Sequence, residues 1–303
     1  MEKIVIIEGP TATGKSALAI GLAREFNGEV ISADSMQVYR RMDIGTAKPS
    51  MKERQAVPHH LIDIVSPDED YTAADFMNDA VSKIKEVRSR GKNIFIAGGT
   101  GLYIKALTKG LFPGPKSDKM LRDMLRKEAQ EKGGLYIHGR LKEVDPEAAS
   151  RIHPNNIIRV IRAIEVYEAA KRPISELQKA HGFSEARFDA LKIGLIKERA
   201  MLYADIENRV ERMVNEGLLE ETRRLLEAGY SMDLKPMCGL GYKEMIGFLH
   251  GKYAFNEAVE ELKKNTRHYA KRQITWFKKD AEIRWFSPQQ KEDIIGLVRG
   301  FLS

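Results

Sequence analysis

The chain has 303 residues, of which 43% are hydrophobic and 31% charged, enough for more than one folded core. Its single cysteine, Cys238, excludes an intramolecular disulfide and a cysteine-based zinc site, and favours a reducing compartment such as the cytoplasm. No apolar run of about 18 residues and no secretory signal pattern is evident, so we expect no membrane association. The net charge of +7 fits either a polyanionic partner or solvated helix faces.

The first predicted element is a buried strand at residues 4–7, followed directly by a glycine-rich turn. That turn matches the phosphate-loop pattern G-x-x-x-x-G-K-[ST] with Gly9, Pro10, Thr11, Ala12, Thr13, Gly14, Lys15 and Ser16. A helical pattern begins at Lys15, so the turn places backbone amides at a helix N-terminus, where an anion binds. We predict that Lys15 meets the terminal phosphates and that the Ser16 hydroxyl ligates a magnesium ion, Mg²⁺.

Strand-like and helical patterns alternate through the first third of the chain, which predicts a parallel sheet with crossover helices. The runs rich in β-branched residues are 4–7, 29–31 and 93–97, and the helical patterns are 15–26 and 73–90. Parallel sheets bind ligands at the carboxyl ends of their strands, where Asp34 and Thr100 fall here. Asp34 could ligate Mg²⁺, accept a proton or cap a helix, and Thr100 could bind substrate or cap the helix at 102–108.

A linker at residues 112–115 separates this part from a stretch, 118–181, that shows only helical patterns. A strand at 190–196 then returns to the sheet. Four helices follow, at 199–216, 218–228, 242–249 and 255–279. A strand at 282–286 and a helix at the C-terminus close the chain. We therefore predict an α/β fold: a phosphate-loop, parallel-sheet core made of residues 1–112 and 190–303, with an all-helical domain inserted at 113–189.

Seven segments in chain order resemble the motifs of the bacterial tRNA dimethylallyltransferases, also called tRNA isopentenyltransferases. The first is the phosphate loop. The others are ISADSMQVYRRMDIGTAKP from Ile31, PHHLIDIVSPDEDYTAADF from Pro58, IAGGTGLYIKALTKGL from Ile96, HPNNIIRVIRAIEVYE from His153, GLGYKEM from Gly239 and TRHYAKRQITWF from Thr266. The resemblance covers nearly the whole chain.

The resemblance implies transfer of the dimethylallyl group from dimethylallyl diphosphate to N6 of adenosine 37 in tRNA, with release of diphosphate. No nucleoside triphosphate would be hydrolysed, and the phosphate loop and Mg²⁺ would hold the diphosphate. Asp34 matches the general base that the poorly nucleophilic amine needs. Thr100 matches a threonine near the reaction centre, and Ser35, Met36 and Gln37 match the segment that lines the pocket of the extruded base.

The resemblance also implies which residues contact tRNA. They are Arg122, the segment Ile158, Arg159, Val160, Ile161 and Arg162, and Arg267, Lys271 and Arg272 on a C-terminal basic helix. Solvated arginines remain the alternative. Trp276 and Phe277 on that helix are expected in the core. Family members commonly carry arginine where this chain has Asp205, so we expect Arg209, one turn later, to bind the diphosphate.

Two other classes of protein share parts of the pattern. A small-molecule kinase would have the phosphate loop and Asp34, but it would not need the helical insertion. A noncatalytic tRNA-binding protein would have the basic helices, but it would leave Lys15 and Asp34 without a function. Adenylate isopentenyltransferases share the chemistry with a free nucleotide as acceptor. The insertion and the basic helix favour tRNA, and no protein partner is implied.

Overall fold

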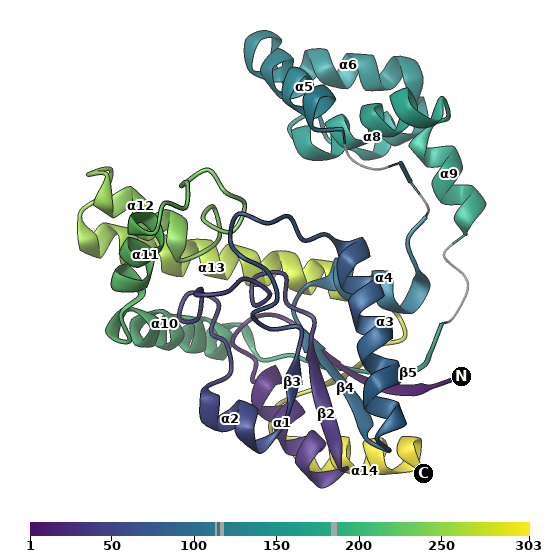
Figure 1. The fold of residues 1–303 in the computed structure, drawn as a ribbon, viewed down its shortest axis with the longest axis vertical. Coiled ribbons are helices and arrows are strands. Elements are labelled where there is room, and N and C mark those ends of the chain that lie inside the picture. The colour runs from purple at the N-terminus through teal and green to yellow at the C-terminus, as the bar shows by residue number, and fades with distance from the viewer. Residues whose placement is uncertain (113, 116–117, 183–186) are drawn as a thin grey trace. The chain divides into compact units, whose positions relative to one another are not determined.

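The computed structural model describes residues 1–112, 114–115, 118–182 and 187–303, which form two compact units (Figure 1). The first unit contains Met1–Thr108 and Arg187–Ser303, and the second contains Lys109–Ala186. The predicted insertion, residues 113–189, overlaps the second unit. Pro113 of the predicted linker lies outside the described residues.

The first unit is built on a parallel sheet, which confirms the predicted fold class. Its described strands are β1 (Lys3–Glu8), β2 (Gly28–Ser32), β3 (His59–His60), β4 (Asn93–Gly98), β5 (Asp189–Leu195) and β6 (Arg284–Phe286). Across the sheet they lie in the order β3-β2-β4-β1-β5-β6, and neighbouring strands run parallel. A sheet covered on both faces requires apolar side chains at successive positions. The run from Ile4 to Ile7 meets that requirement, because all four side chains are fully buried.

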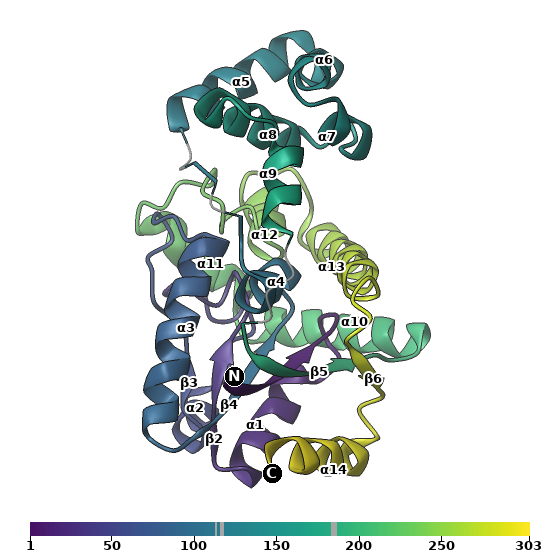
Figure 2. The same ribbon diagram turned by 90° about the vertical axis from the view of Figure 1, so that its right-hand side faces the viewer.

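Helices cover both faces of the sheet, as Figure 2 shows. On one face, Val5 and Ile7 pack with α1 (Lys15–Glu25) and α14 (Lys291–Leu302). On the other face, Ile4 and Ile6 belong to a core formed with α3 (Ala73–Ser89), α4 (Gly101–Lys109), α10 (Arg199–Asn215), α11 (Leu218–Glu227), α12 (Tyr242–Leu249) and α13 (Phe255–Phe277). Successive strand residues point to opposite faces, so β1 is enclosed by both layers.

Two short elements were not predicted. Helix α2 (Met51–Ala56) follows Ser50, whose hydroxyl accepts a hydrogen bond from the Glu53 amide while the Glu53 carboxylate accepts one from the Ser50 amide. Strand β3 then pairs with β2 at the edge of the sheet. Neither element is long enough for a repeating apolar pattern, which is the signal that identified the longer ones.

The second unit contains only helices among its described residues, as predicted. They are α5 (Lys119–Lys132), α6 (Gly134–Val144), α7 (Pro146–Arg151), α8 (Ile157–Ala170) and α9 (Ile174–His181). They enclose their own core, in which Leu125, Ile137 and Leu141 are fully buried. Asp145 caps α7, because its carboxylate accepts a hydrogen bond from the Ala148 amide at 2.8 Å. No helix in the described part of the chain is long and apolar enough to cross a membrane.

Candidate active site

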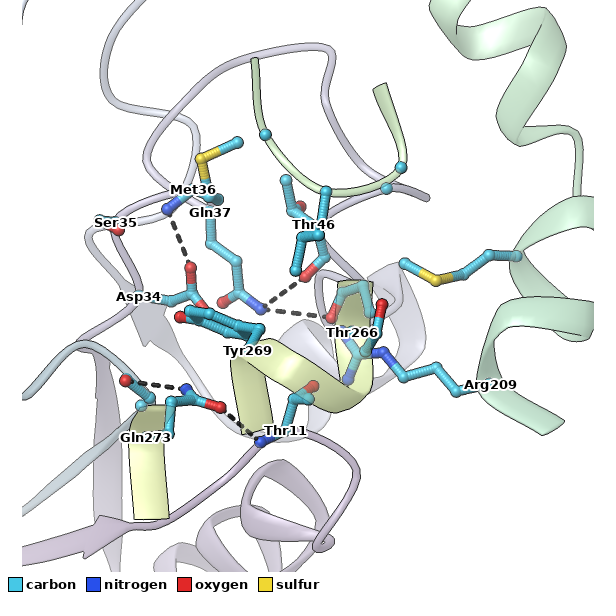
Figure 3. Close-up of a pocket in the computed structure, with 18 of the residues that line it drawn as sticks. Thr11, Asp34, Ser35, Met36, Gln37, Thr46, Arg209, Thr266, Tyr269 and Gln273 are labelled. Carbon is cyan, nitrogen blue, oxygen red and sulfur yellow. Dashed lines mark hydrogen bonds between the residues drawn. The ribbon is translucent and has the colours of Figure 1, made fainter. Parts of the chain in front are cut away.

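A cavity of about 380 Å³ opens in the first unit at the carboxyl ends of β1, β2 and β4 (Figure 3). This is the edge of the sheet where the sequence predicted a ligand. The predicted site residues that line it are Thr11, Lys15, Ser16, Asp34, Ser35, Met36, Gln37, Arg209 and Arg272. The structure therefore brings together residues from the phosphate loop, the end of β2, α10 and α13.

The phosphate loop is a tight turn between β1 and α1. Gly9 and Gly14 adopt left-handed φ angles of 135° and 92°, and a Cβ on Gly9 would lie only 2.4 Å from the Leu195 carbonyl oxygen. The Thr13 hydroxyl donates a hydrogen bond to the Pro10 carbonyl at 2.9 Å, which closes the loop on itself. Three residues of the loop, Thr11, Lys15 and Ser16, line the cavity. The turn around them is formed by Gly9, Pro10, Ala12, Thr13 and Gly14.

Lys15 and Arg209 bring two cationic side chains to the cavity. Burial, and secondarily the charge of Arg209, lowers the pKa of Lys15 to about 7, while Asp34 acts in the opposite direction. Burial also lowers the pKa of Arg209, again opposed by Asp34. Two partly buried cations that line one cavity suit a highly charged anion such as a diphosphate.

Asp34 follows β2 and begins a turn, so no helix is available for it to cap. Its Oδ1 atom accepts a hydrogen bond from the Met36 amide at 2.8 Å, which fixes the orientation of the carboxylate at the cavity. The structure thus removes the helix-cap alternative. A carboxylate that is oriented by its own turn and open to a cavity can accept a proton or contact a metal ion.

Thr100 does not line the cavity but connects two of the loops that do. Its hydroxyl accepts a hydrogen bond from the Ser35 amide at 2.9 Å and donates one to the Ser35 hydroxyl at 3.3 Å. The Thr100 amide donates to the Ala33 carbonyl at 3.2 Å. Its hydroxyl is therefore used to hold the turn after β2, and it does not cap α4.

Gln37 lines the cavity with an amide group that is already engaged. Its Oε1 atom accepts from the Ser32 hydroxyl at 2.9 Å, and its Nε2 atom donates to the carbonyls of Thr46 and Ala47 at 3.3 and 3.2 Å. The side chain therefore ties the turn after β2 to the loop at Thr46 and gives the cavity a fixed wall.

Glu221, which no sequence pattern indicated, anchors that same loop. It is 3% exposed, and its carboxylate accepts hydrogen bonds from the amides of Asp43, Ile44 and Gly45 at 2.8 to 3.0 Å and from the Tyr242 hydroxyl at 2.7 Å. A buried carboxylate with four donors is fully satisfied. The loop from Asp43 to Ala47 is therefore held from α11 and α12, far along the chain.

The departure at Asp205 has a structural counterpart. Its carboxylate forms an ion pair with Lys197 at 2.5 Å, and the same ammonium group lies 3.4 Å from the Ala12 carbonyl of the phosphate loop. Asp205 thus joins α10 to the loop through Lys197. Arg209, one turn later, lines the cavity as expected.

Helix α13 presents part of its predicted basic face to solvent. Lys271 and Arg272 are exposed, whereas Arg267 is paired with Glu207 at 2.8 Å. Phe277 is buried as expected, but the expectation for Trp276 was wrong, because this side chain is 38% exposed. Its indole lies against Gly101, where a Cβ would come within 2.1 Å of the ring nitrogen.

In the second unit, the predicted tRNA-contacting residues divide into three groups. Arg122 and Arg162 both pair with the buried carboxylate of Glu165, at 2.9 and 2.6 Å. Arg159 is exposed, and among the described residues it has no ion-pair partner, while its neighbour Ile158 is 79% exposed. The prediction needs one correction: two of its members, Val160 and Ile161, are 0% and 3% exposed and belong to the helical core.

Fold and site together define a phosphate-loop protein whose cavity contains a carboxylate and two cations. A model of the family described as IPP transferase matches residues 37–280. The chain belongs to this family, and the relatives below are tRNA dimethylallyltransferases by name.

The relatives match the chain over nearly its whole length. It is 54% identical to "tRNA dimethylallyltransferase 2" of Geotalea uraniireducens over 93% of this chain and 91% of that protein. It is 50% identical to the tRNA dimethylallyltransferase of Geobacter metallireducens over 99% and 97%.

Solved structures agree with this assignment. A tRNA isopentenylpyrophosphate transferase from Bacillus halodurans superimposes with a TM-score of 0.74 at 41% identity and covers 100% of this chain and 97% of that one. A eukaryotic dimethylallyltransferase, described as acting on tRNA, superimposes with a TM-score of 0.79 at 30% identity and covers 99% and 78%.

Proposed function

We propose that the protein transfers the dimethylallyl group from dimethylallyl diphosphate to N6 of adenosine 37 in tRNA. The observation that carries this proposal is that the phosphate-loop residues Lys15 and Ser16 line the same cavity, of about 380 Å³, as the carboxylate of Asp34. Membership of the family supplies the donor and the acceptor. A tRNA acceptor and a single cysteine also support a cytoplasmic location.

The donor half of the reaction depends on stabilising a departing diphosphate. As the allylic carbon–oxygen bond breaks, negative charge grows on the leaving oxygen, and fixed cations at that point lower the barrier. Lys15 and Arg209 line the cavity and supply this charge, and the helix N-terminus at Lys15 adds backbone amides. Because the cations are held by the fold, little reorganisation is needed when the bond breaks.

Mg²⁺ fits the oxygen donors at the same place. The exposed Ser16 hydroxyl and the Asp34 carboxylate are hard ligands that line one cavity, whereas no cluster of three or more His, Cys, Asp or Glu side chains suited to a metal occurs in the described chain. Mg²⁺ accepts such a sparse protein site because it retains water and takes phosphate oxygens as ligands. When bound, it would add positive charge beside the diphosphate.

The acceptor half requires a base for the adenine amine. As the new bond forms between N6 and the allylic carbon, the carbon–oxygen bond to diphosphate breaks, and a proton leaves N6 for the Asp34 carboxylate. N6 of a stacked base cannot reach this cavity, so the target base must be extruded into it. We assign Ser35, Met36 and Gln37 to the walls around the base, and Thr100 to holding Ser35 in place.

We further propose that the tRNA stem is bound through exposed basic side chains. In the second unit the candidate is Arg159, next to the exposed Ile158, and on α13 the candidates are Lys271 and Arg272. Arg122, Arg162 and Arg267 already have carboxylate partners, so we assign them to shaping these surfaces. Exposed arginines and lysines that neutralise phosphates give affinity without reading sequence.

The proposal is tested by offering labelled dimethylallyl diphosphate to the purified protein with one acceptor at a time. Unmodified tRNA should take the label, and adenosine monophosphate should not. Label on the free nucleotide would instead indicate an adenylate isopentenyltransferase. A third reaction, with ATP labelled in its terminal phosphate and a panel of metabolites, would reveal the alternative small-molecule kinase.

A further inference from the structure

Gln273 connects three parts of the site that are far apart in the sequence. From α13, its Oε1 atom accepts a hydrogen bond from the Thr11 amide of the phosphate loop at 2.9 Å. Its Nε2 atom donates to the Gly99 carbonyl, after β4, also at 2.9 Å. Figure 3 shows both contacts at the floor of the cavity. The side chain is only 6% exposed, so water cannot easily replace either bond.

The Gln273 side chain fills the space that a side chain at position 99 would need. A Cβ on Gly99 would lie 2.2 Å from Nε2 of Gln273, whereas the next nearest atoms are at 3.5 and 3.8 Å. The φ angle of Gly99 is not in the left-handed region, so the backbone would tolerate another residue. The glycine is therefore required here by the close approach of the amide and by nothing else in its surroundings.

The amide engaged by Gln273 belongs to the loop that must present its other amides to an anion. A phosphate loop binds through backbone N–H groups that have to point in a common direction. Fixing the Thr11 amide from outside orients the first half of the loop, while the Thr13 hydroxyl closes the turn onto Pro10. The same helix carries Tyr269 and Arg272 into the cavity one turn or less from Gln273.

We propose that Gln273 is a positioning residue that holds the phosphate loop in its diphosphate-binding conformation and links it to α13. The inference rests on the proposed function in taking dimethylallyl diphosphate as the donor. In the opposite possibility, Oε1 of Gln273 only occupies the place of a phosphate oxygen on the Thr11 amide, and the bound donor has to displace it. The two possibilities predict opposite changes in donor affinity when the side chain is removed.

The test compares Gln273→Ala, Gly99→Ala and the double variant with the wild-type protein. Gly99→Ala leaves Gln273 in the chain but pushes its amide out of place. Thr275→Ala serves as the control, since this exposed α13 residue donates only to the Lys271 carbonyl of its own helix. For each protein, KM is measured for dimethylallyl diphosphate and for tRNA. Binding of inorganic diphosphate is measured as well, since it does not require the transfer reaction.

We expect Gln273→Ala and Gly99→Ala each to weaken donor and diphosphate binding about five- to hundredfold, the usual effect of leaving buried polar groups unpaired. The KM for tRNA should change less than about twofold, and the Thr275→Ala control should match the wild type. Because both substitutions remove the same contact, the double variant should be no weaker than Gln273→Ala alone.

Unchanged or tighter diphosphate binding in Gln273→Ala would overturn the inference and favour a displaceable placeholder. The inference would also be contradicted if the double variant lost the product of the two single fold-losses in diphosphate binding. A KM for tRNA that rose as much as the KM for dimethylallyl diphosphate would contradict it too. Failure of the proposed function would look different, because the wild-type protein itself would then transfer nothing from dimethylallyl diphosphate to tRNA.

Discussion

The Lys15 ammonium donates a hydrogen bond to the carbonyl oxygen of Pro10, within the same phosphate loop, at 2.5 Å. This partly buried ammonium is thus anchored to its own loop. In the proposed complex, the two other N–H groups of the ammonium are available to a diphosphate oxygen. Burial and, secondarily, the charge of Arg209 lower the pKa of Lys15 to about 7.

The lowered pKa predicts that diphosphate affinity depends on pH through Lys15. Only the protonated form attracts the anion, so affinity is highest about one unit or more below pH 7 and falls by up to about tenfold per unit as pH rises above 7. Diphosphate dissociation constants between pH 6 and 9 check this, with Lys15→Met as the control. That variant should bind weakly with no such slope, and an equal slope in both proteins would assign the titration to another group.

Replacing Asp34 with Asn should slow the chemical step without weakening the binding of the substrates. The amide oxygen can still accept the Met36 hydrogen bond seen at 2.8 Å, but it cannot take the N6 proton. We expect a rate about 10²- to 10⁴-fold lower in single-turnover experiments with saturating tRNA, the usual contribution of a positioned base. A near-normal rate in that experiment would remove Asp34 from this role.

Ser16→Ala should raise the Mg²⁺ concentration needed for half-maximal activity, because the variant lacks the loop hydroxyl that faces the cavity. tRNA affinity, measured without the donor, should be unchanged, since the proposed stem contacts are made elsewhere. The measurement is a Mg²⁺ titration of the transfer rate in parallel with tRNA binding. Equal loss of tRNA binding would argue against this division of the site.

Arg159→Ala should weaken tRNA binding and make it less sensitive to salt. The side chain is exposed, and one lost phosphate contact lowers the slope of log affinity against log salt by somewhat under about one unit. Diphosphate binding should stay the same. If both the slope and the affinity match those of the wild type, Arg159 is only solvated surface.

Arg162→Ala should instead destabilise the helical unit. Burial by itself would raise the pKa of Glu165, but hydrogen bonds from Arg162 and Arg122 hold that pKa below its ordinary value. Removing one partner leaves a buried carboxylate less well paired, at a cost of about 1–3 kcal/mol. Faster hydrogen exchange of the α8 amides would show this, and Arg159→Ala is the matched control that should leave exchange unchanged. Equal exchange in Arg162→Ala and the wild type would contradict this role.

The sequence predicted those parts of the fold and site that depend on local patterns. The β1 run, the phosphate loop and the position of Asp34 at a strand end all follow from neighbouring residues. Glu221 and Gln273 could not be found in this way, because the cavity loops that they hold lie more than 170 residues away in the chain.

The burial of Val160 and Ile161 could have been predicted. Together with Ile157 and Ile164 they have the i, i+3, i+4, i+7 spacing of an apolar helix face. The family resemblance selected the segment, but the periodicity distinguishes its core residues from its surface ones.

In the proposed reaction, Asp34 and the phosphate loop act together on a single nucleotide. The most direct measurement incubates unmodified tRNA with dimethylallyl diphosphate and the wild-type protein, digests the product and locates the added mass. We expect dimethylallyl on N6 of adenosine 37 and none on a tRNA in which guanosine replaces that adenosine. Modification of the guanosine variant, or label at any other position, would contradict it.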